Sequence, residues 1–197
     1  MSSYPNWFQV SAIHYFTKNL TLLNEKPLKC LQLGAYTGDA TKWLFENALN
    51  HPESTLIDVD TWEGSDEDLH RAMDWTSVED VYTTRHQHLI DSGRLKKYKG
   101  TTDDFFQSPE GQQRFDFIYV DADHEAASVL KDGLNAMYRL NPGGILAFDD
   151  YTWSSGKGLW ADPKPAVDAI LNCYPHKITV LDIGAQVWLR VDTPPQK

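Results

Sequence analysis

The sequence contains few cysteines, and this scarcity argues against some architectures. Cys30 and Cys173 are the only two among 197 residues, and neither belongs to a CxxC or zinc-ligand pattern. Disulfide scaffolds and cysteine-based zinc sites depend on such patterns. We therefore expect both cysteines to be small, buried, apolar side chains in a protein of a reducing compartment.

Long apolar runs are also missing. No stretch of the sequence approaches the ~20 apolar residues that a membrane-spanning helix needs. The first residues lack the basic and then apolar pattern that is typical of a secretory signal peptide. We therefore expect a cytoplasmic protein without a membrane partner.

Positive charge is scarce as well. The chain has 18 Lys and Arg against 28 Asp and Glu, which gives a formal net charge of −10 at pH 7. Such a surface disfavours binding to nucleic acid, so we expect no nucleic-acid partner. One basic run at 94–99 (RLKKYK) allows a local patch, but we favour a solvated face that leads into a strand.

The stretch 115–151 carries the strongest signals that are present. Two short apolar runs, 117–120 and 145–148, flank a helix-length amphipathic segment at about 125–140, which predicts two parallel strands joined by a crossover helix. Parallel neighbours place their carboxyl ends at one edge of a sheet, where open α/β sheets bind ligands. We therefore expect the polar groups that follow these strands to share one cleft. They are Asp121, Asp123 and His124 after the first run, and Asp149 and Asp150 after the second.

An earlier segment predicts a ligand cradle. The predicted strand Lys29–Leu33 leads directly into Gly34-Ala-Tyr-Thr-Gly38 and then into a helix at 39–50. A strand, a glycine turn and a helix N-terminus together can hold a nucleotide-like ligand, because a Cβ in the turn would block close approach of the backbone. Taken alone, this glycine pattern is also that of an ordinary turn.

A second predicted strand at 54–59 ends in acidic residues. Rossmann-like folds bind ribose hydroxyls with a carboxylate near this strand end. Asp58 and Asp60 both have suitable spacing, and we favour Asp60 because it lies nearer the exit of the strand. A short third strand is expected to end near Lys99.

The remaining segments are expected to surround the cleft. Aromatic and apolar residues at 4–24, including Leu23, predict one or two helices that pack on the sheet or over the cleft, and a loop at 152–162 with Trp153 and Trp160 suggests a lid or a substrate-selecting wall. His70, His86 and His88 in the polar stretch 66–92 are expected at the surface. The run Asn-Pro-Gly-Gly at 141–144 predicts a turn. Asp162 and the prolines that follow it predict the start of a helix that reaches to about 174. The runs 177–182 and 185–191 predict a hairpin. We expect one domain over 1–197, with a helical cap at about 1–26 and a frayed tail at 192–197.

These features together resemble the class I S-adenosylmethionine-dependent methyltransferases over about residues 28–191. The segments VDADH and NPGGILAFDDYTW resemble the metal-dependent small-molecule O-methyltransferases of the caffeoyl-CoA and catechol type. The similarity to the macrocin O-methyltransferase-like group is closer, because that group has His after the DAD motif and an Asp-Asp pair after strand five. The resemblance implies a Rossmann-like α/β fold with helices on both faces of a seven-stranded, mostly parallel sheet of order 3-2-1-4-5-7-6 and a C-terminal hairpin.

The resemblance also implies the site residues. The cofactor would be S-adenosylmethionine, with Mg²⁺, or else Ca²⁺ or Mn²⁺, as the metal. The implied metal ligands are Asp121, Asp149 and Asp150, and the implied catalytic residues are His124, as general base, and Asp121. The implied cofactor contacts are Gln32, Gly34, Ala35, Tyr36, Gly38, Asp60, Thr61, Thr102, Asp103 and Asp121. Gln32 replaces the usual acid and Tyr36 replaces the middle glycine of GxGxG, so the grip on the cofactor's amino group is expected to differ.

The chemistry accounts for these residue types. Three converging carboxylates cannot all stay ionised unless a cation joins them, and oxygen ligands suit a hard ion such as Mg²⁺. A metal-bound substrate hydroxyl would lose its proton more easily, and His124 could accept that proton at neutral pH. Simpler roles exist: Asp149 and Asp150 as turn caps, Asp123 as a helix cap or a support of the site, Thr101 or Thr102 as the cap of the next helix, and His124 as an exposed histidine without a proton-transfer role.

The leading hypothesis is an O-methyltransferase that acts on a hydroxyl of a small molecule, such as a sugar or an aromatic compound. A metal-independent methyltransferase is the first alternative. A nicotinamide-dependent oxidoreductase is disfavoured because GxGxxG is absent, and a non-catalytic nucleoside-binding module is supported only by the departures at Gln32 and Tyr36. Relatives are often dimers or larger, so the resemblance also allows a homo-oligomer.

Overall fold

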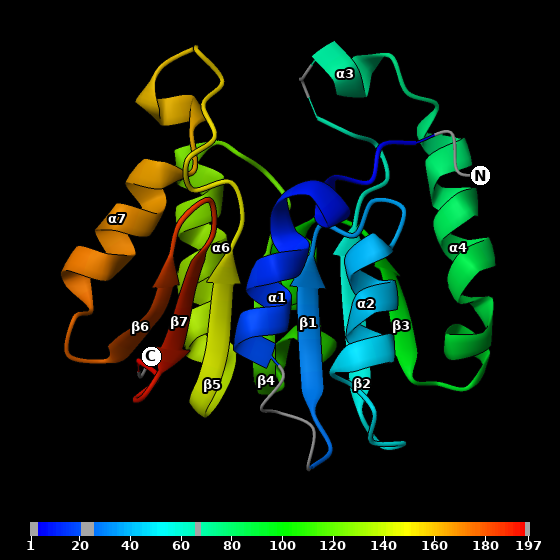
Figure 1. Ribbon diagram of the computed structural model, residues 1–197, viewed down its shortest axis with the longest axis horizontal. Coiled ribbons are helices and arrows are strands. Elements are labelled where there is room, and N and C mark those ends of the chain that lie inside the picture. Colours follow the sequence, from blue (N-terminus) through cyan, green and yellow to red (C-terminus); the bar gives the residue numbers. More distant parts are fainter. Residues whose placement is uncertain (1–3, 21–25, 66–67, 196–197) are drawn as a thin grey trace.

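The strands of the described chain form a single open sheet. The computed structural model describes residues 4–20, 26–65 and 68–195, and in this part of the chain the sheet has seven strands in the order β3-β2-β1-β4-β5-β7-β6 (Figure 1). Strands β1 to β5 run parallel, and β7 runs antiparallel to both β5 and β6. The predicted fold class and strand order are confirmed. The bounds are β1 Lys29–Leu33, β2 Thr55–Asp60, β3 Leu95–Lys99, β4 Phe115–Val120, β5 Leu140–Phe148, β6 Ile178–Ile183 and β7 Val187–Val191.

Helices cover both faces of the sheet, which explains why its central strands are apolar on both sides. One core cluster joins one sheet face to α1 (Ile13–Leu20), α2 (Asp39–Asn47) and α4 (Trp75–Asp91). A second cluster joins the opposite face to three further helices: α5 (Thr102–Gln107), α6 (Ala126–Arg139) and α7 (Lys164–Cys173). The first three of these helices along the chain therefore cover one face and the last three the other, and the carboxyl edge of the sheet is left to the loops.

Short elements surround that edge. They are η1 (Phe8–Ala12), α3 (Asp68–Arg71) and η3 (Leu159–Ala161), whereas η2 (Glu110–Gln112) directly precedes β4 and lies at the opposite edge. Figure 1 shows α3 on one side, and the yellow-to-orange loop that contains η3 on the other, rising beyond the carboxyl ends of the strands. The loop at 152–162 thus lies where the sequence predicts it. Leu23 of the predicted N-terminal helices lies outside the described residues.

Several local predictions are wrong. His86 is expected at the surface, but it lies on helix α4 and is only 1% exposed, because this face of α4 packs on the sheet. The predicted turn at 141–144 is instead the first part of β5. Cys30 is buried as expected, but Cys173 is exposed at the last position of α7. In the tail, the backbone amides of Asp192 and Thr193 both donate to the carbonyl of Lys177, so this part is held against β6.

Among residues 4–20, 26–65 and 68–195, no helix is long and apolar enough to cross a membrane.

Candidate active site

The sheet topology brings four loop starts to one edge. The carboxyl ends of β1, β2, β4 and β5 are adjacent because these strands are parallel and neighbours in the sheet. The backbone joins them directly: Gly34 donates to the carbonyl of Val59, Asp121 to that of Leu33, and Asp149 to that of Val120. The predicted cofactor loop and the predicted acidic residues therefore lie side by side.

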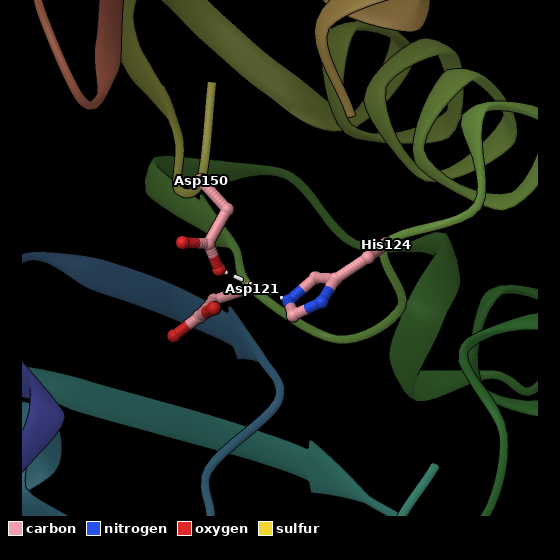
Figure 2. Close-up of side chains that lie close together, drawn as sticks. All are labelled: Asp121, His124 and Asp150. Carbon is pink, nitrogen blue, oxygen red and sulfur yellow. Dashed lines mark ion pairs between the residues drawn. The ribbon is translucent and has the colours of Figure 1, made fainter. Parts of the chain in front are cut away.

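Three chemically active side chains converge beyond β4 and β5 (Figure 2). In the described part of the chain, one ligand atom each from Asp121, His124 and Asp150 lies within 4.8 Å of the other two. His124 Nε2 lies 3.0 Å from Asp150 Oδ2, and the His124 ring packs on Trp153 with centroids 4.6 Å apart. Asp150 has φ 55°, a left-handed conformation that is uncommon for a residue with a side chain. This backbone turn directs the Asp150 carboxylate toward the other two groups.

Electrostatic repulsion within this cluster is strong. Burial raises the pKa of Asp121 well above its ordinary value, and the neighbouring carboxylates of Asp149 and Asp150 raise it further. The pKa of Asp149 is raised for the same reasons, burial first and then Asp150. The protein alone therefore favours a proton on this cluster, and a bound cation would serve the same purpose.

Asp149 lies beside the cluster but is not part of it. Its carboxylate accepts a short hydrogen bond from the Tyr119 hydroxyl and another from the Asp150 backbone amide. Tyr119 in turn accepts from Gln186 Nε2, and Trp188 Nε1 donates to Gln186 Oε1. Since the indole nitrogen can only donate, this buried chain of bonds has one direction and ends at Asp149. Asp149, the third predicted metal ligand, is thus bonded to buried groups of the core. The three side chains that converge are Asp121, Asp150 and, in place of Asp149, His124.

No local motif predicts this chain of bonds. Gln186 and Trp188 come from the C-terminal hairpin, and Tyr119 lies inside a strand that the sequence marks only as apolar. What these residues share is a polar group at a position that the sheet buries. They can be recognised only once the strand register is known. Asp123 is not the predicted helix cap, because the N-cap of α6 is Glu125; the Asp123 Oδ1 instead accepts from the backbone amides of His124 and Glu125 in the turn before the helix.

The loop Gly34–Gly38, which is predicted to bind the cofactor, approaches the end of β4 so closely that its first residue must be glycine. Gly34 has φ 85°, and a Cβ placed there would lie 1.8 Å from the backbone oxygen of Asp121. Gly38, with φ 79°, precedes α2 and would place a Cβ 2.2 Å from His86 Nε2. Tyr36 has φ 49°, although it replaces the middle glycine. The loop therefore keeps the left-handed conformations of a glycine turn despite the substitution.

Asp60 braces this loop from the end of β2. Its Oδ2 accepts from the backbone amides of Ala35 at 2.7 Å and Tyr36 at 2.9 Å, and its Oδ1 accepts from that of Trp62 at 2.7 Å. A carboxylate offers about four lone-pair sites, so these three bonds leave one for another donor. The residue that the sequence predicts as the ribose acid is also a structural part of the loop.

We expect Asp60→Ala to destabilise the protein by about 2 kcal/mol, because three partly buried amides lose their acceptor. Asp60→Asn keeps one acceptor oxygen for Ala35 and Tyr36 and is expected to lose about half as much. Urea unfolding of both variants measures the difference. An unfolding free energy of Asp60→Ala equal to that of the wild type would contradict the bracing role.

Helix α4 clamps the other end of the loop. Arg85 Nη1 donates to the carbonyl of Thr37 at 2.9 Å and pairs with Asp39 Oδ1 at 2.7 Å. His86 Nε2 lies 3.0 Å from the carbonyl oxygen of Gly38. Burial lowers the pKa of His86 to about 4, so the ring is neutral and must carry its proton on Nε2 to donate to this carbonyl. The sequence predicts neither contact, because His86 is expected at the surface and Arg85 has no predicted role.

The other predicted cofactor residues have these partners. Gln32 Nε2 donates to the carbonyl of Gly34 at 2.7 Å, and the Thr61 hydroxyl accepts from the backbone amide of Glu63 at 3.2 Å. Thr102 bonds the buried Asp132 of α6, and Asp103 pairs with Lys131. The helix cap of α5 is Thr101, as one of the two predicted alternatives has it. Thr102 and Asp103, which are predicted to lie near the adenine, thus bond side chains of α6.

Aromatic side chains gather beside the loop. The Tyr36 ring contacts those of Trp7 and Trp75 with centroids 4.6 and 6.0 Å apart. The ring centroid of His70 lies 5.6 Å from that of Trp7 and 5.1 Å from that of Trp75. The N-terminal segment, the loop and the start of α4 are therefore joined at the mouth of the site, as the predicted packing role of the N-terminal aromatics requires.

Comparisons with known proteins agree with this geometry. A family model described as a methyltransferase domain matches residues 31–151, which is more than half of the chain. No curated protein matches the sequence. Structures with this fold include a Klebsiella pneumoniae protein described as an O-methyltransferase (14% identity, TM-score 0.63, 98% of this chain and 82% of that one). They also include a Clostridium thermocellum protein described as an rRNA methylase (11%, 0.68, 94% and 98%).

A third structure of the same fold is MycE of the mycinamycin biosynthetic pathway, in complex with Mg and SAH. It is 14% identical with a TM-score of 0.63, and the match covers 93% of this chain but 49% of MycE. At such identities these structures show the fold alone, whereas the family model covers the cofactor loop, Asp60 and the acidic cluster together. This chain therefore belongs to the methyltransferase domain family.

Proposed function

We propose that this protein, acting as a single domain, transfers the methyl group of S-adenosylmethionine to a hydroxyl of a small molecule, with a divalent cation such as Mg²⁺ at the acidic cluster. The convergence of Asp121, His124 and Asp150 within 4.8 Å carries the proposal. It places a carboxylate pair and an imidazole next to the glycine loop that would hold the cofactor's methionine end. MycE, which has this fold, was solved with Mg and SAH.

The donor set fits a hard cation. Asp121 and Asp150 supply oxygen atoms, and repulsion between these carboxylates is the cost that a bound cation would remove. A bound divalent ion lowers the pKa of a hydroxyl that it contacts. The negative charge of the site and of the chain favours an uncharged or cationic acceptor over an anionic one.

In this proposal each residue has a distinct task. The Gly34–Gly38 loop and Asp60 bind the cofactor, and Asp121 and Asp150 are the cation ligands. His124 accepts the acceptor's hydroxyl proton, and Trp153 packs on its ring and restricts its motion. Asp149 supports Asp150 through the bond to its backbone amide.

One observation favours a metal-independent methyltransferase as the second candidate. His124 Nε2 and Asp150 Oδ2 lie 3.0 Å apart, which is the arrangement of a base oriented by a carboxylate. In that case Asp150 would orient His124 and increase its basicity without any cation.

Calorimetric titration of S-adenosylhomocysteine (SAH) into the protein, with and without Mg²⁺, tests the proposal. We expect micromolar-range binding of SAH, and a Mg²⁺ binding event that disappears in Asp121→Asn. Binding of SAH without any effect of Mg²⁺ or of a chelator on methyl transfer would leave the metal-independent enzyme. Absence of SAH binding would refute the methyltransferase function of this chain.

A further inference from the structure

Two buried oxygen atoms on neighbouring strands lack a hydrogen-bond donor. Gln32 on β1 and Asp58 on β2 are register partners, so their side chains lie on the same face of the sheet. Gln32 is 2% exposed and Asp58 is fully buried. In the described part of the chain, Gln32 Oε1 and Asp58 Oδ1 are both without a partner. Such unpaired acceptors are costly, and two adjacent ones point to a missing hydrogen.

Among the residues that the structure describes, no cation pairs with Asp58. Its Oδ2 accepts from the hydroxyls of Thr41 at 2.6 Å and Tyr82 at 2.7 Å. Lys97 is its register partner on β3, but Lys97 Nζ binds Glu79 at 2.6 Å and lies over the Trp62 ring. An ionised Asp58 would thus be a buried charge without a counter-ion. The titratable or charged groups around it are Tyr82 of α4, Cys30 of β1, Asp60 of β2 and Lys97 of β3.

We propose that Asp58 is a neutral carboxylic acid that donates its Oδ1 proton to Gln32 Oε1, and that this proton keeps Gln32 oriented to hold the cofactor loop. One hydrogen then satisfies both unpaired oxygens. Burial raises the pKa of Asp58 from 3.8 to about 7, the bonds from Thr41 and Tyr82 oppose this rise, and the charge of Asp60 adds to it. Asp58 and Gln32 are positioning residues, since they act through the loop.

The effect on the loop follows from the two ends of the Gln32 amide. While Oε1 accepts from Asp58, Nε2 donates to the Gly34 carbonyl at 2.7 Å. The amide of the same peptide unit, that of Ala35, donates to Asp60 Oδ2 at 2.7 Å, so both ends of this peptide are held. When Asp58 loses its proton, its Oδ1 attracts the Gln32 N–H groups, and rotation of the amide turns Oε1 toward the Gly34 carbonyl. The Gly34–Ala35 peptide unit then loses one of the two bonds that hold it.

The pH dependence of SAH affinity tests this proposal, which rests on the proposed function. Between about pH 6 and pH 8.5, loss of one hydrogen bond should weaken wild-type binding about three- to tenfold. Asp58→Asn has the shape of the protonated acid and donates from Nδ2 at every pH, so its SAH affinity should stay at the wild-type low-pH value. Asp116→Asn is a matched change near the start of β4, a strand that pairs with β1 and not with β2, and it should keep the wild-type dependence. A wild-type dependence that persists in Asp58→Asn would overturn the proposal.

Stability gives a second readout that needs no ligand. A folded-state pKa raised to about 7 contributes stability that is complete below the unfolded-state value and is lost as the pH rises from about 4 to about 7. Asp58→Asn should abolish this part of the pH dependence of unfolding. Carbon-13 NMR of the wild-type carboxyl groups adds a test without a variant: an Asp58 resonance titrating near pH 4 would refute its neutral state. Absence of SAH binding at every pH would refute the proposed function, while this titration would still decide the protonation of Asp58.

Discussion

Gly34→Ala should destabilise the protein by about 4 kcal/mol, the largest effect that we expect of any single methyl group added to this chain. The new Cβ would lie 1.8 Å from the backbone oxygen of Asp121, and both segments are anchored, since the amides of Gly34 and Asp121 donate to the carbonyls of Val59 and Leu33 at the ends of neighbouring strands. The left-handed φ of 85° adds about 1–2 kcal/mol of this cost. Urea unfolding measures the total, and SAH titration should show loss of binding.

Gly143→Ala separates the two contributions. Gly143 has nearly the same backbone angle, φ 81°, but no atom within 4 Å of an added Cβ. We expect this variant to lose only about 1–2 kcal/mol, the conformational cost alone. Equal losses in the two variants would show that the contact between the loop and Asp121 is less tight than the structure indicates.

Asp150→Asn should lower the rate of methyl transfer about a thousandfold. In the proposed function Asp150 holds the cation and pairs with His124 at 3.0 Å, so both the activation of the hydroxyl and the orientation of the base suffer. SAH affinity should change by less than about twofold, because no bond joins Asp150 to the glycine loop in the described structure. Transfer of a labelled methyl group to an acceptor found by screening, together with Mg²⁺ titration, measures these effects.

The matched control is Asp91→Asn, which removes one carboxylate at the exposed end of α4. Its methyl transfer should equal that of the wild type, which excludes an effect of net charge. If Asp150→Asn retained full activity with and without a chelator, neither the cation nor the His124 dyad would take part in the reaction.

How far the site follows from the sequence differs between its two halves. The glycine loop and the acids after β4 and β5 are local signals, because a strand, a turn and a strand end each leave a pattern in consecutive residues. The interactions that hold these parts in place leave no such pattern in consecutive residues. Asp60, Arg85 and His86 hold the loop through bonds to backbone atoms, and backbone atoms are the same for every residue type.

Polar residues inside apolar strands show the same limit. Gln32, Asp58 and Tyr119 interrupt runs that predict buried strands. The sequence suggests a ligand role for Gln32 and, as the less favoured ribose acid, for Asp58, but none for Tyr119. The register makes Gln32 the neighbour of both Asp58 and Tyr119, and this places three polar groups in a row across the sheet. Gln32 then reaches the Gly34 carbonyl, Asp58 the hydroxyls of Thr41 and Tyr82, and Tyr119 the Asp149 carboxylate, which are partners that no local pattern predicts.

The sequence by itself determined the α/β class, the strand order through its family resemblance, and the positions of the glycine turn and of Asp121, His124 and Asp150. These depend on interactions between residues that are close along the chain or on patterns with a fixed period. Only the tertiary structure decided that Asp149 turns toward Tyr119 and the hairpin, that α4 clamps the loop, and that Asp58 faces Gln32. Each of these contacts joins segments far apart in the sequence, and its energy depends on burial and register, which exist only once the sheet has formed.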